Sequence, residues 1–186
     1  APILSSTSPT DNATGVAAGA NIVLTFNENV AAGSGNITLK KSSDNSTVQA
    51  MAVGGANVSI SGAVVTINPT ANLASSQGYY VQVDATAIDD TSGNSFAGIS
   101  DTTTLSFTAA DSSGPAIASS SPADNATGVA VDANIILTFD ENVVVGSGNI
   151  TLKKSSDNST VQAMPVGGGN VSASGAVVTI NPLSLI

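Results

Sequence analysis

The chain repeats itself, and this repetition constrains its fold more than any other feature. When the 186-residue sequence is compared with itself at an offset of 113 positions, Pro9 falls on Pro122. At this offset the segment Gly33–Met51 recurs unchanged as Gly146–Met164. Self-similarity at a fixed period is the signature of repeated structural units. The sequence therefore predicts two copies of one domain, joined in tandem.

The repeat also predicts the domain boundaries. Gly114-Pro115 corresponds to Ala1-Pro2, which gives a first unit over residues 1–113 and a second over residues 114–186. The second unit reaches Ile186, which corresponds to Leu73, so residues 74–111 have no counterpart in it. We therefore expect the first repeat to be complete and the second to be truncated, without its last two strands.

Composition indicates an all-β fold. Charged residues make up 9% of the chain, against about 25% in average proteins. Much of the polar content is Ser, Thr, Asn and Gly, which favours strands and turns over helices. Aromatic residues are 3% of the chain and Trp is absent. The core must therefore consist mostly of Val, Ile, Leu and Ala.

The first unit contains short segments of alternating hydrophobicity, which are separated by turn-forming residues. Asn21–Phe26 is the clearest, with Ile22, Leu24 and Phe26 on one face. About seven such strands with turn signals between them are typical of an immunoglobulin-like β-sandwich. The predicted strands are 3–6, 21–26, 36–40, 47–53, 64–68, 79–84 and 104–108.

Tyr79 stands at the start of the predicted strand 79–84, in the same inward phase as Val81 and Val83. Sandwiches often place a tyrosine corner at this position, in which the hydroxyl bonds to the backbone a few residues upstream. A tyrosine that only packs at the end of the strand would give the same pattern. Both interpretations remain open from the sequence.

A set of segments in a fixed order resembles a known family. They are Ser8–Val16, Asn21–Val30, Gly35–Leu39, Tyr79–Val83 and Asp90–Asn94. Together they resemble the bacterial Ig-like domain of the type found in the SbsA S-layer protein. The resemblance implies a β-sandwich that occurs in arrays in large secreted or surface-attached bacterial proteins, often as a spacer with calcium at the domain ends.

The residue inventory excludes most catalytic chemistry. With no His and no Cys, the chain cannot form a Ser-His-Asp triad, a thiolate nucleophile or a zinc site of the usual ligands. Asp89 and Asp90 are a formal carboxylate pair, but neighbouring residues seldom converge across a sugar. The net charge of −9 argues against binding to nucleic acid, and no apolar run is long enough to span a membrane. We therefore expect no enzyme, no nucleic-acid partner and no membrane insertion.

Acidic loops suggest calcium instead. In a seven-strand sandwich the first strand begins at the pole where two other acidic loops of the unit lie, and carboxylates crowded together repel unless a cation relieves them. Ca²⁺ accepts six to eight carboxylate and carbonyl oxygens. Solvated turn residues are the alternative, since Asp and Asn also cap turns. The predicted ligands are Glu28, Asp89, Asp90, Asn94, Asp111, Asp140 and Glu141.

These observations predict a structural or adhesive repeat of a secreted or cell-surface bacterial protein, stiffened by calcium and flanked by neighbouring repeats of the same protein. A second hypothesis follows from the truncation. A unit without its last two strands exposes open edges, and could exchange strands with other copies to form a filament. A third is a module that binds carbohydrate or another cell-surface ligand, although such sites usually need exposed aromatic residues.

Overall fold

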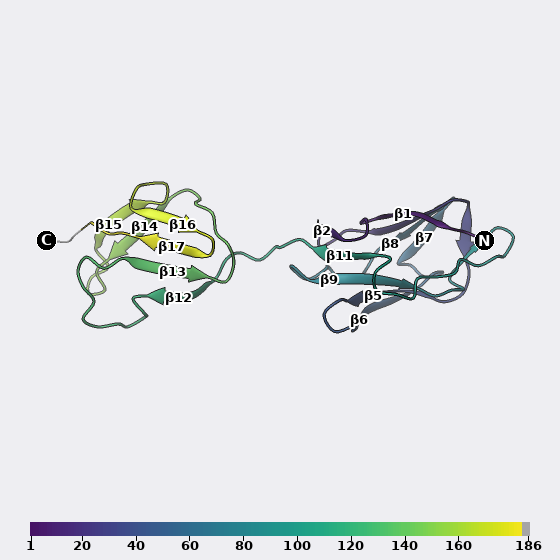
Figure 1. The fold of residues 1–186 in the computed structure, drawn as a ribbon, viewed down its shortest axis with the longest axis horizontal. Coiled ribbons are helices and arrows are strands. Elements are labelled where there is room, and N and C mark those ends of the chain that lie inside the picture. The colour runs from purple at the N-terminus through teal and green to yellow at the C-terminus, as the bar shows by residue number, and fades with distance from the viewer. Residues whose placement is uncertain (184–186) are drawn as a thin grey trace. The chain divides into compact units, whose positions relative to one another are not determined.

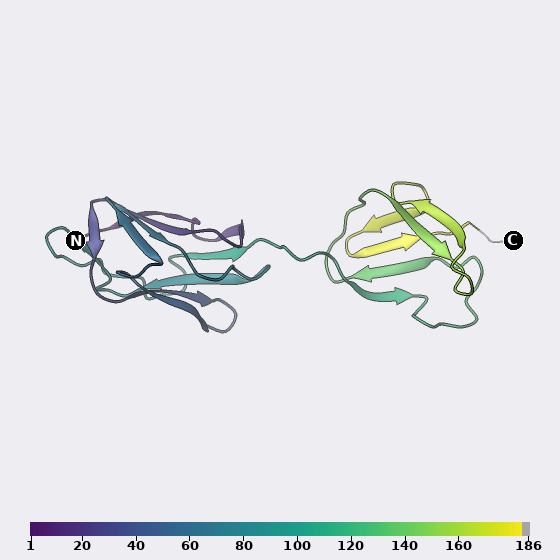
Figure 2. The ribbon, with the colours of Figure 1, turned by 180° about the vertical axis from the view of Figure 1, so that it is seen from behind.

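The computed structural model describes residues 1–183 and contains strands but no helix in that range. The chain forms two compact units, Ala1–Ser113 and Gly114–Ile186, which Figures 1 and 2 show from opposite sides. Each unit consists of antiparallel sheets packed face to face, except for one parallel strand pair in unit 1. The prediction of an all-β, immunoglobulin-like sandwich is confirmed.

Unit 1 has a first layer of four antiparallel strands. Their order in the sheet is β1-β3-β8-β7. β3 lies in the middle because it pairs with β1 on one side and with β8 on the other. The strands are β1 (Leu4–Ser8), β3 (Ile22–Phe26), β7 (Val58–Ser61) and β8 (Val64–Ile67).

The second layer of unit 1 has five strands in the order β2-β11-β9-β5-β6, and a two-stranded ribbon of β4 and β10 lies beside it. β9 joins the layer together, since it pairs with β11 and with β5. The strands are β2 (Ala13–Val16), β4 (Val30–Ala32), β5 (Asn36–Lys41), β6 (Thr47–Ala52), β9 (Gly78–Val83), β10 (Ile88–Asp90) and β11 (Ser106–Ala109).

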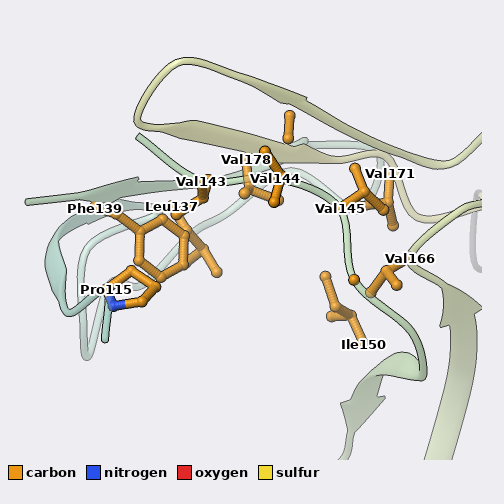
Figure 3. Close-up of a pocket in the computed structure, with 12 residues that line it drawn as sticks. Pro115, Leu137, Phe139, Val143, Val144, Val145, Ile150, Val166, Val171 and Val178 are labelled. Atoms are coloured by element: carbon orange, nitrogen blue, oxygen red, sulfur yellow. The ribbon is translucent and has the colours of Figure 1, made fainter. Parts of the chain in front are cut away.

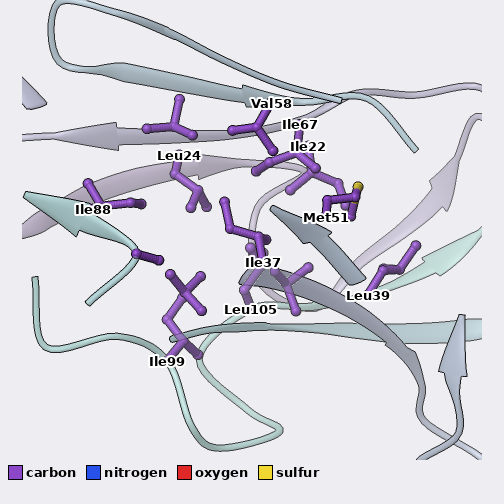
Figure 4. Close-up of a cluster of buried hydrophobic side chains, with 14 of the residues drawn as sticks. Ile22, Leu24, Ile37, Leu39, Met51, Val58, Ile67, Ile88, Ile99 and Leu105 are labelled. Carbon is purple, nitrogen blue, oxygen red and sulfur yellow. The ribbon is translucent and has the colours of Figure 1, made fainter. Parts of the chain in front are cut away.

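The core of unit 1 lies between the two layers, as Figure 4 shows. Side chains alternate across a strand, so Leu24 of β3 and Ile37 of β5 point inward from opposite sheets. Both are fully buried. The later part of unit 1 completes the core, because Ile88 of β10 and the loop residues Ile99 and Leu105 are also buried at 3% exposure or less.

Unit 2 repeats six strands of unit 1, and its segments 126–129 and 143–145, which correspond to β2 and β4, are not strands. It has a four-stranded sheet in the order β12-β13-β17-β16 and a separate hairpin of β14 and β15. Residues 114–183 contain no counterpart of β9, β10 or β11. The strands are β12 (Ile117–Ser121), β13 (Ile135–Phe139), β14 (Asn149–Lys153), β15 (Thr160–Pro165), β16 (Val171–Ser174) and β17 (Val177–Ile180).

All seven strands predicted for unit 1 are present within two residues of their expected bounds. Four further strands were not predicted: β2, β4, β7 and β10. Each has only three or four residues, and β2, β4 and β10 depend on partners distant in sequence for their pairing.

Tyr79 forms the tyrosine corner that the sequence left open. Its hydroxyl accepts a hydrogen bond of 2.8 Å from the backbone N–H of Ala74, five residues upstream. The ring is 2% exposed and lies 5.8 Å from the ring of Phe107, measured between centroids. The polar end of the side chain thus fixes the turn before β9, while the ring fills the core.

Candidate functional site

The acidic pole of unit 1, which we define as Glu28, Asp90 and Asn94 with Ala1, is organised around Asp90. This carboxylate belongs to the last residue of β10 and is only 6% exposed. One oxygen accepts hydrogen bonds from the backbone N–H groups of Ser92 (2.8 Å) and Asn94 (2.9 Å). The other accepts one of 2.7 Å from the side-chain amide of Asn94. Asp90 therefore holds its own loop in place.

Ala1 lies against this pole. The amino group of Ala1 lies 3.4 Å from Oδ2 of Asp90 and 3.8 Å from Oε1 of Glu28. The structure thus brings together three of the residues predicted as calcium ligands. Asp90 and Asn94 bond to each other, and Glu28 faces the same amino group from the loop between β3 and β4.

The other predicted ligands lie elsewhere. Asp89 precedes Asp90 in β10 and accepts a hydrogen bond of 2.6 Å from the hydroxyl of Ser95. Asp111 follows β11, which lies away from the N-terminus in Figure 1, and accepts a hydrogen bond of 2.7 Å from the hydroxyl of Ser75. Each carboxylate is thus engaged in local structure.

Asp140 and Glu141 belong to unit 2. Asp140 accepts a hydrogen bond of 2.8 Å from the backbone N–H of Ala116, as Asn27 does from that of Ile3 in unit 1. Glu141 is half-buried in the loop after β13. Across residues 1–183 no three acidic side chains lie close enough to hold a metal ion together. The observed contacts are those of loop-capping residues.

Hydrogen bonds are the main cause of the lowered pKa values of several acids in unit 1. Those from the side chain and backbone of Asn94, helped by Ser92, hold the pKa of Asp90 at about 2 although burial raises it. The amides of Thr103 and Thr104, with the Thr104 hydroxyl, hold the pKa of Asp101 well below its usual range. Hydrogen bonding to the charged form is the common cause.

We expect unit 1 to lose stability in acid because of these groups. A carboxyl with a depressed pKa in the folded state contributes stability above its unfolded pKa of about 4. That contribution disappears as the pH falls from about 4 through the folded pKa, which is about 2 for Asp90. Urea titrations at intervals of about half a pH unit between pH 5 and pH 2 measure the loss in the free energy of unfolding of unit 1. In the Asp90→Asn variant the free energy of unfolding should depend less on pH over this range. An unchanged pH dependence would contradict the role of Asp90 in acid stability.

A second group of contacts joins β2, the second strand of unit 1, to β11, its last strand. β2 and β11 run parallel, with Ala13 opposite Phe107 and Val16 opposite Ala109. The N–H of Ala110 donates a hydrogen bond of 2.7 Å to the carbonyl of Val16. Nothing in the local sequence signals this pairing, since β2 and β11 are far apart in the chain.

Asp11 stabilises the same strand pair. Its carboxylate accepts hydrogen bonds of 2.9 Å from both the backbone N–H and the hydroxyl of Ser106, and these bonds lower its pKa. The N–H of Asn12 donates a further hydrogen bond of 2.7 Å to the carbonyl of Ser106. Asp11 is not among the residues predicted from the sequence. Its position in a turn gives no sign of a partner 95 residues away.

The aromatic residues are placed for packing. In unit 1 Phe26, Phe96, Phe107, Tyr79 and Tyr80 are all buried. The rings of Phe26 and Phe96 meet edge to face with centroids 5.2 Å apart. Unit 1 therefore presents no exposed aromatic platform on which a sugar ring could stack.

Residues 1–183 contain no helix long and apolar enough to cross a membrane. A comparison with curated proteins gives no significant match. Solved structures give matches at 16% identity, which concern the fold alone. CopC from Methylosinus trichosporium OB3b covers 61% of this chain and 98% of its own, with a TM-score of 0.43.

Two further matches are crystal structures of S-layer proteins, also at 16% identity. For rSbsC(31-844) the match covers 96% of this chain and 23% of the other, with a TM-score of 0.39. For the N-terminal part of the bacterial S-layer protein SbsC the match covers 99% of this chain and 42% of the other, with a TM-score of 0.40. This chain thus spans less than half the length of either S-layer structure.

The sequence profile of one family covers nearly the whole chain. The profile described as bacterial Ig-like domain matches residues 1–109 and again residues 111–185. The two matches correspond to the two units of the structure and to the internal repeat. The chain therefore belongs to the bacterial Ig-like domain family, of which it contains two copies.

Proposed function

We propose that this chain is a load-bearing spacer of a secreted or surface-attached bacterial protein, without catalytic activity of its own. Domains of this family are typically non-catalytic modules. The resemblance of the chain to bacterial Ig-like repeats supports a place outside the cell. The observation that carries the mechanical part of the proposal is the parallel pair of β2 and β11 in unit 1.

This geometry resists tension. The chain enters unit 1 through β1, which pairs with β3, continues into β2, and leaves unit 1 directly after β11. A pull on the two ends therefore loads β1 first and then drags the parallel strands β2 and β11 in opposite directions along their axes. The hydrogen bonds of Asn12, Ala110 and Asp11 between them are then loaded together rather than one after another. Unit 2 has no parallel strand pair within residues 114–183.

Single-molecule stretching of the chain, held at its two ends, tests this role. Forced unfolding depends on the unfolding barrier, so we expect unit 1 to unfold at a clearly higher force than unit 2. Ala110→Pro removes the N–H that bonds to Val16 and should lower the unfolding force of unit 1. Ala110→Gly keeps that N–H and serves as the control. Equal forces for the two variants would refute a mechanical role for this strand pair.

Calcium stiffening stays a prediction, supported by the convergence of Glu28 and Asp90 on the amino group of Ala1. Thermal melts in millimolar Ca²⁺ and in EDTA test it. A rise in the melting temperature of unit 1 that is lost in Glu28→Gln would establish a site. No rise would leave Asp90 as a loop-capping residue, whose two oxygens are already engaged by N–H donors.

A further inference from the structure

The side chain of Ser75 bonds to successive residues of the linker, which we define as residues 110–116 between β11 and β12. Ser75 is half-buried in the loop before β9, and its hydroxyl donates a hydrogen bond of 2.7 Å to Oδ1 of Asp111. It accepts hydrogen bonds from the backbone N–H of Ser112, at 2.9 Å, and from the hydroxyl of Ser113, at 3.1 Å. A serine hydroxyl has one hydrogen to donate and two lone pairs that accept. Ser75 therefore uses its full hydrogen-bonding capacity on the linker.

The tyrosine corner fixes the position of Ser75. Before it in the chain, the N–H of Ala74 donates to the hydroxyl of Tyr79 at 2.8 Å, and the ring of Tyr79 is buried in the core. After it, the N–H of Ser76 donates to the carbonyl of Ala110 at 3.3 Å. Both chain neighbours of Ser75 are thus bonded to unit 1. Tyr79 is a positioning residue, which holds the Ser75 hydroxyl where the linker passes.

The other end of the linker is bonded to unit 2. The N–H of Ala116 donates to Oδ1 of Asp140 at 2.8 Å, and the N–H of Asp140 donates to the carbonyl of Ala116 at 3.0 Å. Ile3 and Asn27 form the same reciprocal pair in unit 1, at the same two distances. This attachment is therefore a property of the repeat, since Asp and Asn both offer the accepting oxygen.

Gly114 and Pro115 lie between the two attachments. Pro115 lies with Leu137 and Phe139 at one end of an open apolar groove of about 300 Å³ in unit 2 (Figure 3). Its ring fixes φ near −65°. Gly114 makes no hydrogen bond to any of the described residues, and a Cβ on it would have nothing within 4 Å. The backbone freedom of the linker is thus concentrated at Gly114.

We propose that Ser75 attaches the linker to unit 1 as far as Ser113, so that Gly114 and Pro115 alone form the joint between the repeats. Without this attachment the free segment would extend over residues 111–115. A chain spans at most about 3.5 Å per residue, so Ser75 shortens the reach of the free segment from about 17 Å to about 7 Å. A shorter joint restricts the relative motion of the two repeats. This inference does not depend on the mechanical role of β2 and β11.

Backbone ¹⁵N relaxation of the whole chain tests the proposal. We expect order parameters near 0.85 for the N–H groups of Ser112 and Ser113, as in rigid backbone, and values below about 0.6 in Ser75→Ala. Ser112→Ala is the matched control, because it removes a hydroxyl from the linker but keeps the N–H that donates to Ser75. It should leave the order parameter of Ser113 unchanged. High order parameters in β9 show that unit 1 stays folded in both variants.

The distance between two spin labels provides a second readout. The chain has no Cys, so Ser59→Cys in β7 and Ser172→Cys in β16 place one label on each unit. Both positions are exposed. We expect a wider distribution of distances in Ser75→Ala than in the chain that keeps Ser75, because its free segment is longer.

Tyr79→Phe tests the positioning role, since Tyr79 has no bond to residues 111–113 in the described structure. The variant frees the N–H of Ala74, so the order parameters of Ser112 and Ser113 should fall. A loss of core stability alone would leave them unchanged well below the melting temperature.

Three results would overturn the proposal. One is an order parameter below about 0.6 for Ser112 and Ser113 in the unmodified chain. Another is the absence of any change in Ser75→Ala, in both the order parameters and the distances. The third is an equal fall in Ser75→Ala and Ser112→Ala, which would show that the Ser75 hydroxyl is not the point of attachment.

Discussion

Leu24→Ala is expected to lower the free energy of unfolding of unit 1 by about 2 to 5 kcal/mol. Leu24 is fully buried in β3, between the two layers of the sandwich. Truncation removes apolar contacts and leaves a cavity that a closed, well-packed core can fill only in part. Urea unfolding, followed by resonances assigned to each unit, measures the loss.

Leu137→Ala is the matched control, because Leu137 occupies the same position in β13 of unit 2. It is only partly buried and lines the open groove. We expect a loss of about 1 kcal/mol, the transfer free energy of the part that is buried. Equal losses for the two leucines would contradict an open face in unit 2.

Gly33→Ala is expected to destabilise unit 1 by about 1 to 3 kcal/mol, the usual cost of overpacking. The loop from Thr86 to Asp89 lies directly over Gly33, whose N–H donates to the carbonyl of Ala87. A methyl group there would meet a backbone oxygen, so the loop would have to move and break that bond. The melting temperature of unit 1 reports the effect.

The same substitution in unit 2 separates this clash from any intrinsic effect of alanine. Gly146 is exposed, and a methyl group on its Cα would have no atom within 4 Å beyond its chain neighbours. Gly146→Ala should therefore change the stability of unit 2 by less than about 0.5 kcal/mol. A comparable loss in both units would show that the loop contact is not the cause.

The sequence was sufficient to predict the sandwich because its evidence is local. Asn21–Phe26 and Asn36–Lys41 alternate clearly, and the repeat presents the pattern of residues 1–73 a second time. β2 was missed for the opposite reason: it is four residues long, includes Gly15, and pairs with a strand almost at the other end of unit 1. Short strands that depend on distant partners leave little pattern in the sequence.

The candidate site was harder to predict. The sequence indicated that Glu28, Asp90 and Asn94 share a pole, and the structure brings them together. It could not indicate that Asp90 uses both oxygens to bind amides of its own loop. Such bonds depend on loop geometry, and the same residue types would serve a cation or a turn equally well.

Amide hydrogen exchange at β5 and β14 tests the central claim, that unit 1 is a closed sandwich and unit 2 an open one. The two strands have the same sequence, so their intrinsic exchange rates are equal. The N–H groups of Asn36 and Ser42 bond toward β9 and its flanking residues, which places those of Thr38 and Lys40 on the same side.

We predict that Thr38 and Lys40 exchange slowly, whereas their counterparts Thr151 and Lys153, on the free edge of β14, exchange far faster. Ile150 and Leu152 face β15 and should keep the protection that its pairing gives. Equal protection of Thr38 and Thr151, in a chain shown to be monomeric, would contradict the account.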